Sequence, residues 1–361
     1  MKFLVNHNDF NPAGLQFFKP VLQSFQTRGH QLTDNPGQVH FVLNLTNADH
    51  PKIFRRESKS IFVITFVVLN KPVADLKKTC YQTLIRSLSN MVVCINLVEN
   101  EPRIYFTTPE AGFYDTAFEA DAVYERILPV AGSHFAMDNT LVADLPPTYR
   151  KSTPVVDMII KYGRELDHLG VLPTPFPLKE VLSDEDIAQL YNLFEVKGIS
   201  YGNLSAREHI PDFADDQTFW MTGRGVDKAN LSKIGSDIFL VRDFDEETLS
   251  LRLSVPPGYN PKGRVSVDAV EHALIYRTFP EVGAIIHIHA WQYGIPCTRQ
   301  NYPCGTIELA REVVDLLRMT PNPNQSVIGL KNHGLTITGH DFEDIFSRIH
   351  GNLHTQVAMY S

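Results

Sequence analysis

The chain has 361 residues, of which 43% are hydrophobic and 20% are charged. This is the composition of a globular protein that buries a sizeable core, and the length suits two domains of about 100 to 200 residues each. The net charge of -8 and the absence of any lysine or arginine run argue against a nucleic-acid partner, because a protein that binds nucleic acid must neutralise several phosphates.

Cysteine usage and hydropathy indicate a cytoplasmic protein. The four cysteines form no CxxC pair and are few for the length, as expected in a reducing compartment. Polar residues interrupt the N-terminal segment MKFLVNHNDF too early for a signal-peptide core. The longest apolar run, residues 61–69, is far shorter than the roughly 20 residues of a membrane helix, so we expect no membrane partner.

Residues 1–148 predict a small α/β domain. MKFLVNH and VHFVLNL are typical of strands, and the spacing between them is helical at Leu15, Phe18, Val21, Leu22 and Phe25. Strand-like runs follow at SIFVITFVVL, MVVCINLV and RIYFTT, with a helical stretch near residues 74–88. Rossmann-like winding is one form that this domain could take. No GxGxxG follows the first strand, so a dinucleotide cofactor is not supported.

The polar, proline-rich segment LPPTYRKSTP predicts a domain boundary, with a second domain at residues 149–361. Amphipathic helices are expected near residues 155–170 and 183–198. Strands are expected at TFWMTG, SDIFLV, GAIIHIHA, SVIGLKNHG and LTITG, with helices at residues 266–279 and 308–318 between them. A last helix from Phe342 is expected to continue to the end of the chain. This half is therefore also α/β or α+β.

Three histidines in this second half form a candidate metal site. His287 and His289 lie two positions apart on an apolar strand, so their side chains project from the same face. His333 ends a second apolar run, and it converges on the other two if the strands are neighbours. Three histidines with an open position are typical of catalytic zinc sites. The ordinary alternative is a set of buried core histidines, and the spacing alone favours neither.

Residues 155–361 resemble the class II aldolase and adducin head family, which includes fuculose-phosphate and rhamnulose-phosphate aldolases and ribulose-phosphate 4-epimerase. The order and spacing of five motifs carry the resemblance: GNLSAR (202–207), MTGRGVDK (221–228), SVDAVEH (266–272), FPEVGAIIHIHA (279–290) and LKNHGLTITG (330–339). It implies a C-terminal α/β/α domain with a central, largely antiparallel sheet. The first 145 residues have no counterpart in these aldolases.

The resemblance implies roles for four residues. His287, His289 and His333 match metal ligands, and the expected cofactor is a divalent metal, with Zn²⁺ favoured over Mn²⁺, Co²⁺ or Fe²⁺. Asp268 matches a catalytic position, where aspartate is closer to the epimerase than to the aldolases. Without the histidines, Asp268 reads as an acid that stabilises a helix N-terminus.

The resemblance also implies a substrate-phosphate site. The matching positions are Gly202, Asn203, Thr222, Gly223 and Ser266. Glycine lets backbone N–H groups approach an anion, and small polar side chains complete such a cradle. The alternative is that these are turn residues. Arg224 is either a cation of this pocket or a surface residue. His272, one turn after Asp268, either supports the site or belongs to the core.

The implied activity is that of a lyase of the class II aldolase type, acting on a phosphorylated or acidic keto-sugar through a metal-stabilised enediolate. Epimerisation, decarboxylation and dehydration are alternatives at the same site, because the fold does not choose the reaction. A non-catalytic assembly module, like the adducin heads, is a third alternative. The implied partners are a small sugar-type substrate and further copies of the chain in a homo-oligomer.

Two departures leave the proton-transfer group unassigned. Between the HxH pair and the next helix lies only AWQYGIPCTRQNYPCGT, which is too short for the helical segment that supplies an acid/base residue in the sugar-phosphate enzymes. The chain also ends without their tyrosine-bearing tail, so Tyr360 is not assumed equivalent. Tyr293, Tyr302, Glu308 and the N-terminal domain are the candidate replacements.

Overall fold

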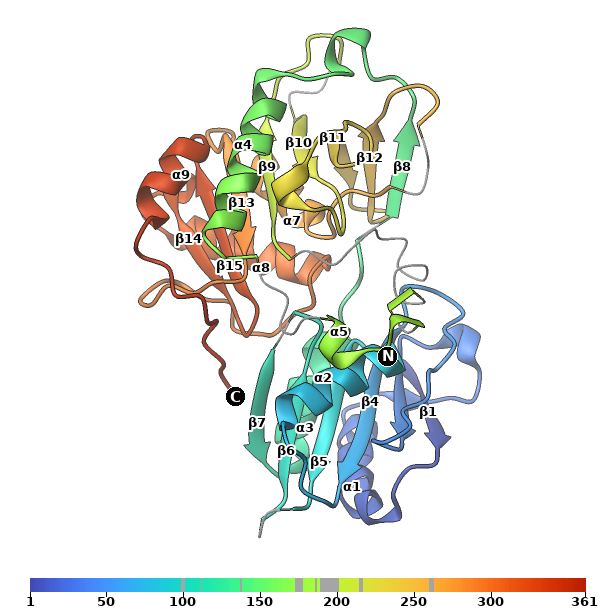
Figure 1. The fold of residues 1–361 in the computed structure, drawn as a ribbon. Helices are drawn as coiled ribbons and strands as arrows, with labels where there is room; N and C mark the ends of the chain where they lie inside the picture. The colour runs from blue at the N-terminus through green and yellow to red at the C-terminus, as the bar shows by residue number, and fades with distance from the viewer. Residues whose placement is uncertain are drawn as a thin grey trace.

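The computed structural model describes residues 1–361 except 99–100, 111, 137, 173–177, 186, 189–200, 214–216 and 260–262. Figure 1 shows two lobes, one above the other, each built on its own β-sheet. No helix among the described residues is long and apolar enough to cross a membrane. The mixed α/β fold class predicted for both halves is confirmed.

The sheet of the first lobe has seven strands in the order β2-β1-β3-β4-β5-β6-β7. The first five strands in this order are parallel to one another, and β6 pairs antiparallel with both β5 and β7. The strands are β1 (Lys2–Asn8), β2 (Gln31–Leu32), β3 (Phe41–Thr46), β4 (Phe62–Leu69), β5 (Met91–Asn96), β6 (Arg103–Thr107) and β7 (Phe113–Ala117). The parallel part follows the order 2-1-3-4-5, which is the flavodoxin-like form of the doubly wound α/β fold.

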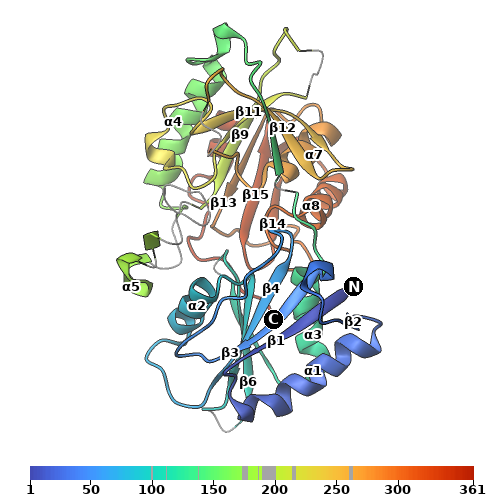
Figure 2. The same cartoon turned by 90° about the vertical axis from the view of Figure 1, so that its right-hand side faces the viewer.

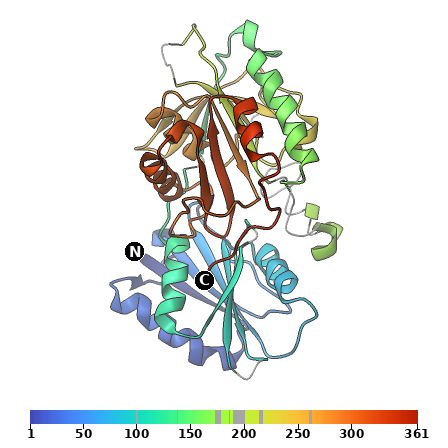
Figure 3. The ribbon, with the colours of Figure 1, turned by 90° about the vertical axis from the view of Figure 1, so that its left-hand side faces the viewer.

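Helices cover both faces of this sheet. α1 (Leu15–Thr27) and α3 (Ala120–Ala131) pack together on one face, and α2 (Leu76–Ser87) covers the other. Figures 2 and 3 show the sheet between these helices. All eight residues of β4 are buried, as expected for a central parallel strand that is covered on both faces.

The second lobe holds an eight-stranded sheet in the order β14-β15-β13-β9-β10-β11-β12-β8. Every pair is antiparallel except β12 with β8, which confirms the expected, largely antiparallel sheet. The strands are β8 (Asp138–Val142), β9 (Asn203–Arg207), β10 (Phe219–Thr222), β11 (Ile238–Asp245), β12 (Ser250–Ser254), β13 (Ala284–Ile288), β14 (Val327–Leu330) and β15 (Gly334–Gly339).

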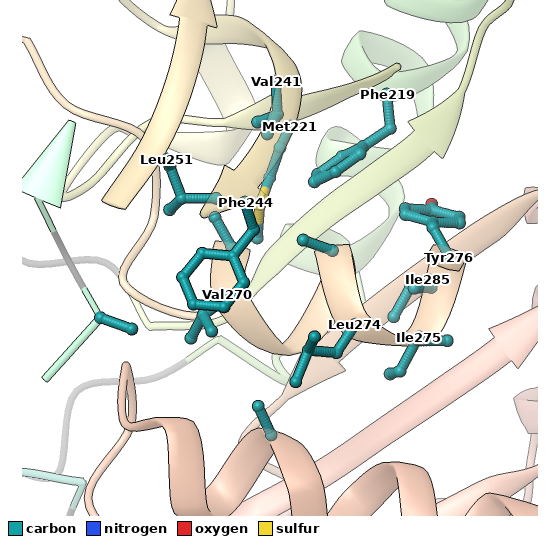
Figure 4. Close-up of a cluster of buried hydrophobic side chains, with 14 of the residues drawn as sticks. Phe219, Met221, Val241, Phe244, Leu251, Val270, Leu274, Ile275, Tyr276 and Ile285 are labelled. Carbon is teal, nitrogen blue, oxygen red and sulfur yellow. The ribbon is translucent and has the colours of Figure 1, made fainter. Parts of the chain in front are cut away.

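Two hydrophobic clusters lie on opposite faces of this second sheet. α7 (Ala269–Thr278) and α8 (Ile307–Met319) cover one face, and α4 (Pro154–His168) and α9 (Phe342–Ile349) cover the other. Figure 4 shows α7 side chains packed against the first face. Every residue of α7 from Ala269 to Tyr276 is buried, so this helix carries polar groups as well as apolar ones into the interior.

Strand β8 precedes the predicted boundary at residue 148 but belongs to the second sheet. Its five residues pair in parallel with Ser250–Ser254 of β12. The change from the first sheet to the second therefore falls between α3 and β8. The division into domains at 148 and 149 stays a prediction, whereas the sheets divide about ten residues earlier.

The C-terminal segment differs from the sequence prediction. α9 ends at Ile349, and residues 351–361 continue without a helix, so the expectation of a helix to the chain end is wrong. The segment pairs its His354 with Trp291 and then runs to the first lobe, where the Ser361 hydroxyl donates to the Asp115 carbonyl. Most of the helix predicted at 183–198 lies outside the described residues; α5 (Leu178–Val181) precedes it.

Candidate metal centre

Three buried imidazoles converge at one end of the second sheet. His287 lies on β13, His289 follows that strand, and His333 lies in the turn between β14 and β15. One ligand nitrogen from each lies within 4.8 Å of the others. The ring centroids are 4.6 to 5.2 Å apart. The structure thus brings together the three histidines that the sequence selected.

The state of these imidazoles suits metal coordination. The Nδ1 of His287 lies 3.0 Å from the Leu335 carbonyl, which can only accept, so this nitrogen carries the proton and Nε2 is left as the ligand. Burial lowers the pKa of all three histidines, which favours the neutral form that binds metals. The Nδ1 of His333 is buried without a hydrogen-bond partner. A divalent cation would satisfy a nitrogen in such a position, so the residues fit a metal.

A buried polar network connects the sheet to α7 beside these histidines. Neighbouring strands present Asn203, Ser205, His287 and Thr336 to the α7 face, because alternate residues of a strand share one side. The Ser205 hydroxyl lies 2.7 Å from Nδ1 of His272 and 2.8 Å from the Tyr276 hydroxyl. His272 is therefore held in the core by this network, with its Nε2 buried and unpaired.

Asp268 lies at the N-terminal end of α7, where it accepts a hydrogen bond of 2.6 Å from Nδ2 of Asn203. Its side chain makes no capping bond to the helix, so the helix-acid explanation alone does not account for its position. Burial lowers the pKa of His287, and the negative charge of Asp268 offsets part of this decrease. The carboxylate therefore contributes to the electrostatic environment of His287.

Lys228 was missed at the sequence level, although it ends the MTGRGVDK motif. It begins a short 3-10 helix, Lys228–Asn230, and is 2% exposed. Burial lowers the pKa of its ammonium to about 8, against the opposing effects of Asp268 and Asp227. Its charge also lowers the pKa of His287 and His289. Its place in the motif could have marked Lys228 as a site residue, but a lysine next to an aspartate is ordinarily expected to be exposed at the surface.

Glu271 is a second buried charge that sequence reasoning did not select. Its Oε1 accepts a hydrogen bond of 2.5 Å from the Thr336 hydroxyl. Burial, followed by the nearby Asp268 carboxylate, raises the pKa of Glu271 to about 8. No pattern in the sequence indicates this burial, because a glutamate in the first turn of a helix is ordinarily an exposed residue that favours the helix dipole.

The residues expected to hold a phosphate lie side by side next to Asp268. Thr222 and Gly223 follow one another at the end of β10, and the Thr222 hydroxyl accepts from the Leu204 N–H at 3.3 Å. The Ser266 N–H donates to the Thr222 carbonyl at 3.1 Å. Asn203 begins the neighbouring strand β9. The structure therefore brings the predicted cradle together at the N-terminal end of α7, a place that favours anions.

Glycine is needed at the two glycine positions of this cradle for different reasons. Gly202 has φ +73°, and a Cβ there would lie 2.7 Å from the His287 carbonyl oxygen. Gly223 has no positive φ, but a Cβ there would lie 2.9 Å from the Phe239 ring. Packing alone thus accounts for Gly223, whereas Gly202 is required by its backbone conformation and by its close approach to a metal-ligand candidate.

Arg224 is half-buried, and its backbone N–H donates to the Arg264 carbonyl at 2.9 Å. Its charge lowers the pKa of the Cys304 thiol, which burial and Asp268 raise. Arg224 is therefore not a fully exposed surface residue, and its place in the anion pocket stays a prediction.

The candidate proton-transfer residues lie in different parts of the structure. Tyr293 is 65% exposed and its ring contacts His354. Glu308 binds His134, with 2.7 Å between Oε1 and Nδ1. Tyr302 lines a cavity of about 560 Å³ between the lobes, together with Glu308 and Lys331. Tyr360 is tied to Asn332 by two hydrogen bonds. None of these contacts involves the three histidines.

The sequence profile described as Class II Aldolase and Adducin N-terminal domain matches residues 185–300. This match confirms the predicted resemblance of this part of the chain to the class II aldolase and adducin family. The match includes His287, His289, Asp268 and the cradle, and it stops before His333.

Two curated relatives are both named methylthioribulose-1-phosphate dehydratase. The chain is 36% identical over 89 residues to that of Serratia proteamaculans (strain 568), covering 25% of this chain and 34% of the relative. It is 32% identical over 89 residues to that of Citrobacter koseri, covering 24% and 34%. The chain thus spans about a third of the length of these relatives.

Solved structures similar to this chain include an L-fuculose 1-phosphate aldolase. The similarity has a TM-score of 0.37 and 17% sequence identity, and it covers 56% of this chain and 82% of the aldolase. An aldolase II superfamily protein from Pseudomonas syringae has a TM-score of 0.35 and 17% identity, and the similarity covers 55% and 72% of the two chains.

Proposed function

We propose that this chain is a metal-dependent lyase that acts on a phosphorylated or acidic keto-sugar. The observation that carries the proposal is the convergence of His287, His289 and His333 beside Asp268. A divalent cation, with Zn²⁺ favoured, supplies a positive charge that polarises a carbonyl group and stabilises negative charge on its oxygen. Mn²⁺, Co²⁺ and Fe²⁺ also suit imidazole ligands.

The chain's own groups divide the remaining work. Thr222, Ser266 and the free N-terminal end of α7 offer donors to the phosphate or carboxylate of the substrate. Arg224 adds a positive charge on the same side. Asp268, held by Asn203, accepts the proton that leaves a substrate carbon. Lys228 brings a buried positive charge to the neighbourhood of this carboxylate.

Water loss is the reaction that we favour over carbon–carbon cleavage, because both curated relatives carry the name of a sugar-phosphate dehydratase. Epimerisation remains the alternative suggested by an aspartate at position 268, and decarboxylation is a further alternative. The intact set of buried histidines supports an enzyme over a non-catalytic assembly module.

The test is an assay of the full chain, loaded with Zn²⁺ and then with Mn²⁺, Co²⁺ or Fe²⁺. A panel of phosphorylated keto-sugars and sugar acids separates the reactions by their products: water loss without fragmentation, release of an aldehyde, or an isomer. Turnover that depends on added metal is expected. Inactivity with every metal and substrate would contradict the proposal, and absence of bound metal would favour the assembly module.

We further propose that the chain assembles as a homo-oligomer, as the resemblance implies. Light scattering of the purified chain measures its mass directly, and a mass equal to that of one chain would contradict this proposal.

A further inference from the structure

The described residues of the β6–β7 turn of the first lobe, 108–110 and 112, lie against the candidate metal centre of the second. The Tyr201 hydroxyl donates to the Pro109 carbonyl at 2.8 Å, and the Tyr201 ring lies 4.6 Å from that of His289. A Cβ at Gly112 would lie 3.2 Å from the backbone oxygen of Asn332, the residue before His333. Only Tyr201 therefore lies between the turn and His289, and the turn contacts the residue that precedes His333.

This turn brings a buried carboxyl group to the lobe interface. Glu110 is 7% exposed, although it lies in a turn. Its Oε1 accepts from the Cys304 N–H at 3.3 Å and from the Cys304 thiol at 3.2 Å. Both bonds end on the same oxygen, and the Thr108 side chain and the backbone of Glu110 also interact with this carboxyl group.

Cys304 connects this carboxyl to the site. Burial, followed by the charges of Glu110 and Asp268, raises the pKa of the Cys304 thiol, and the charge of Arg224 lowers it. The other groups that face Glu110 are Tyr81 of α2, Tyr114 of β7 and Tyr201. Burial raises the pKa of each tyrosine and of the thiol, so these neighbours stay neutral near pH 7.

We propose that Glu110 is the general acid of the lyase reaction, supplied to the metal centre by the first lobe of the same chain. The inference rests on the proposed function. It fills the role left open by the short segment between His289 and α8, and it gives the first lobe a catalytic task. Burial also raises the pKa of Glu110, which is the direction of shift that a general acid requires.

The step balances for the loss of water. Asp268 takes the proton from the substrate carbon, and the electrons of that C–H bond form the new double bond. The neighbouring C–O bond breaks, its electron pair stays on the oxygen, and the departing hydroxyl takes the Glu110 proton and leaves as water. Asp268 then returns its proton to solvent and Glu110 regains one, so the chain is unchanged.

Glu110→Gln tests the role, because the amide oxygen still accepts from Cys304 while the transferable proton is gone. With the substrate turned over by the wild type, kcat is expected to fall on the order of 10²-fold, with KM and metal content little changed. The fall in wild-type kcat above the pKa of Glu110 should weaken in the variant. The matched control is Glu101→Gln, an exposed glutamate near the other end of β6, which should behave as wild type.

Cys304→Ala separates proton transfer from a structural contact. If Glu110 only holds the lobes together through Cys304, Glu110→Gln, which keeps the acceptor oxygen, should retain its activity and melting temperature, while Cys304→Ala should lose both. A general acid predicts the opposite order, with a much larger kcat loss in Glu110→Gln than in Cys304→Ala. An active wild type with unchanged kcat and pH profile in Glu110→Gln would overturn the inference alone. An inactive wild type would overturn the proposed function and this inference with it. If Glu110→Gln does not fold, Glu110→Asp, which keeps a shortened acid, is expected to retain part of the activity, and full activity or none in a folded Glu110→Asp counts against the role.

Discussion

Asn203 on β9 and Asp268 at the start of α7 are joined by a hydrogen bond of 2.6 Å between Nδ2 and Oδ2. The bond points the carboxylate of a helix end toward strands that lie 65 positions earlier in the chain. Asp268 is 6% exposed, so few other arrangements of this carboxylate are available. Asn203 is therefore a positioning residue for Asp268.

Asp268→Asn keeps the size of the side chain and removes the proton acceptor. We expect kcat to fall on the order of 10²- to 10⁴-fold, the usual contribution of a positioned acid or base. Steady-state kinetics with melting temperatures and metal content measures this. Asp212→Asn, at an exposed position, is the control. Wild-type turnover in Asp268→Asn would remove Asp268 from proton transfer.

His289→Ala should abolish stoichiometric metal binding, because it leaves two imidazoles of the three that converge. Elemental analysis of protein purified without chelators gives the metal content, and turnover should disappear with it. His340→Ala, at an exposed histidine close to the same sheet, should keep both. Full metal occupancy in His289→Ala would mean that His289 is not a ligand.

Gly202→Ala and Gly170→Ala form a matched pair. Both glycines have positive φ, +73° and +66°, so both substitutions introduce strain of about 1 to 2 kcal/mol. A Cβ at Gly202 would also approach the His287 carbonyl oxygen within 2.7 Å, while a Cβ at Gly170 meets nothing within 4 Å. We expect Gly202→Ala to lose a further ~1 to 3 kcal/mol and its metal affinity. Equal unfolding free energies for the pair would contradict the close approach.

Glu271 makes the stability of the metal-free protein depend on pH. Its pKa is about 8 in the folded protein against 4.5 for the ordinary group, so the folded state binds more protons between these values. The free energy of unfolding should therefore fall as the pH rises from 4.5 to 8, by an amount on the order of a few kcal/mol.

Glu271→Gln removes this titration, so its stability should vary less over the same range. Denaturant unfolding of chelator-treated protein at several pH values measures the slope. Parallel pH dependence in wild type and variant would show that other groups cause it.

The sequence predicted those parts of the site that depend on local patterns. The alternation of strand side chains placed His287 and His289 on one face, and the apolar run before His333 predicted its strand. The cradle residues were predicted from the resemblance to the aldolase family. Pairing between distant segments had no such signal: Glu271 and Lys228 look like exposed residues until the burial of α7 and of the 3-10 helix is known.

The N-terminal turn and the chain end show the same limit. Glu110 is a turn residue in an unmatched half of the sequence, and only the docking of the two lobes brings it to Cys304. Residues 351–361 follow α9 directly, so the sequence predicts that the helix continues. They instead make backbone contacts with Trp291 and Asn332, which are far away in the sequence. The predicted boundary at proline-rich residues 145–154 marks a loop within the second lobe.

Strand β8 limits how this protein can be divided or transplanted. A chain that starts at residue 149 would lack β8 and leave β12 as an open edge of unpaired N–H and C=O groups, which invites pairing with other chains. A graft of the second lobe onto another protein would therefore have to carry residues 138–148 with it. The segment that connects the two lobes is therefore part of the second sheet and not a separate linker.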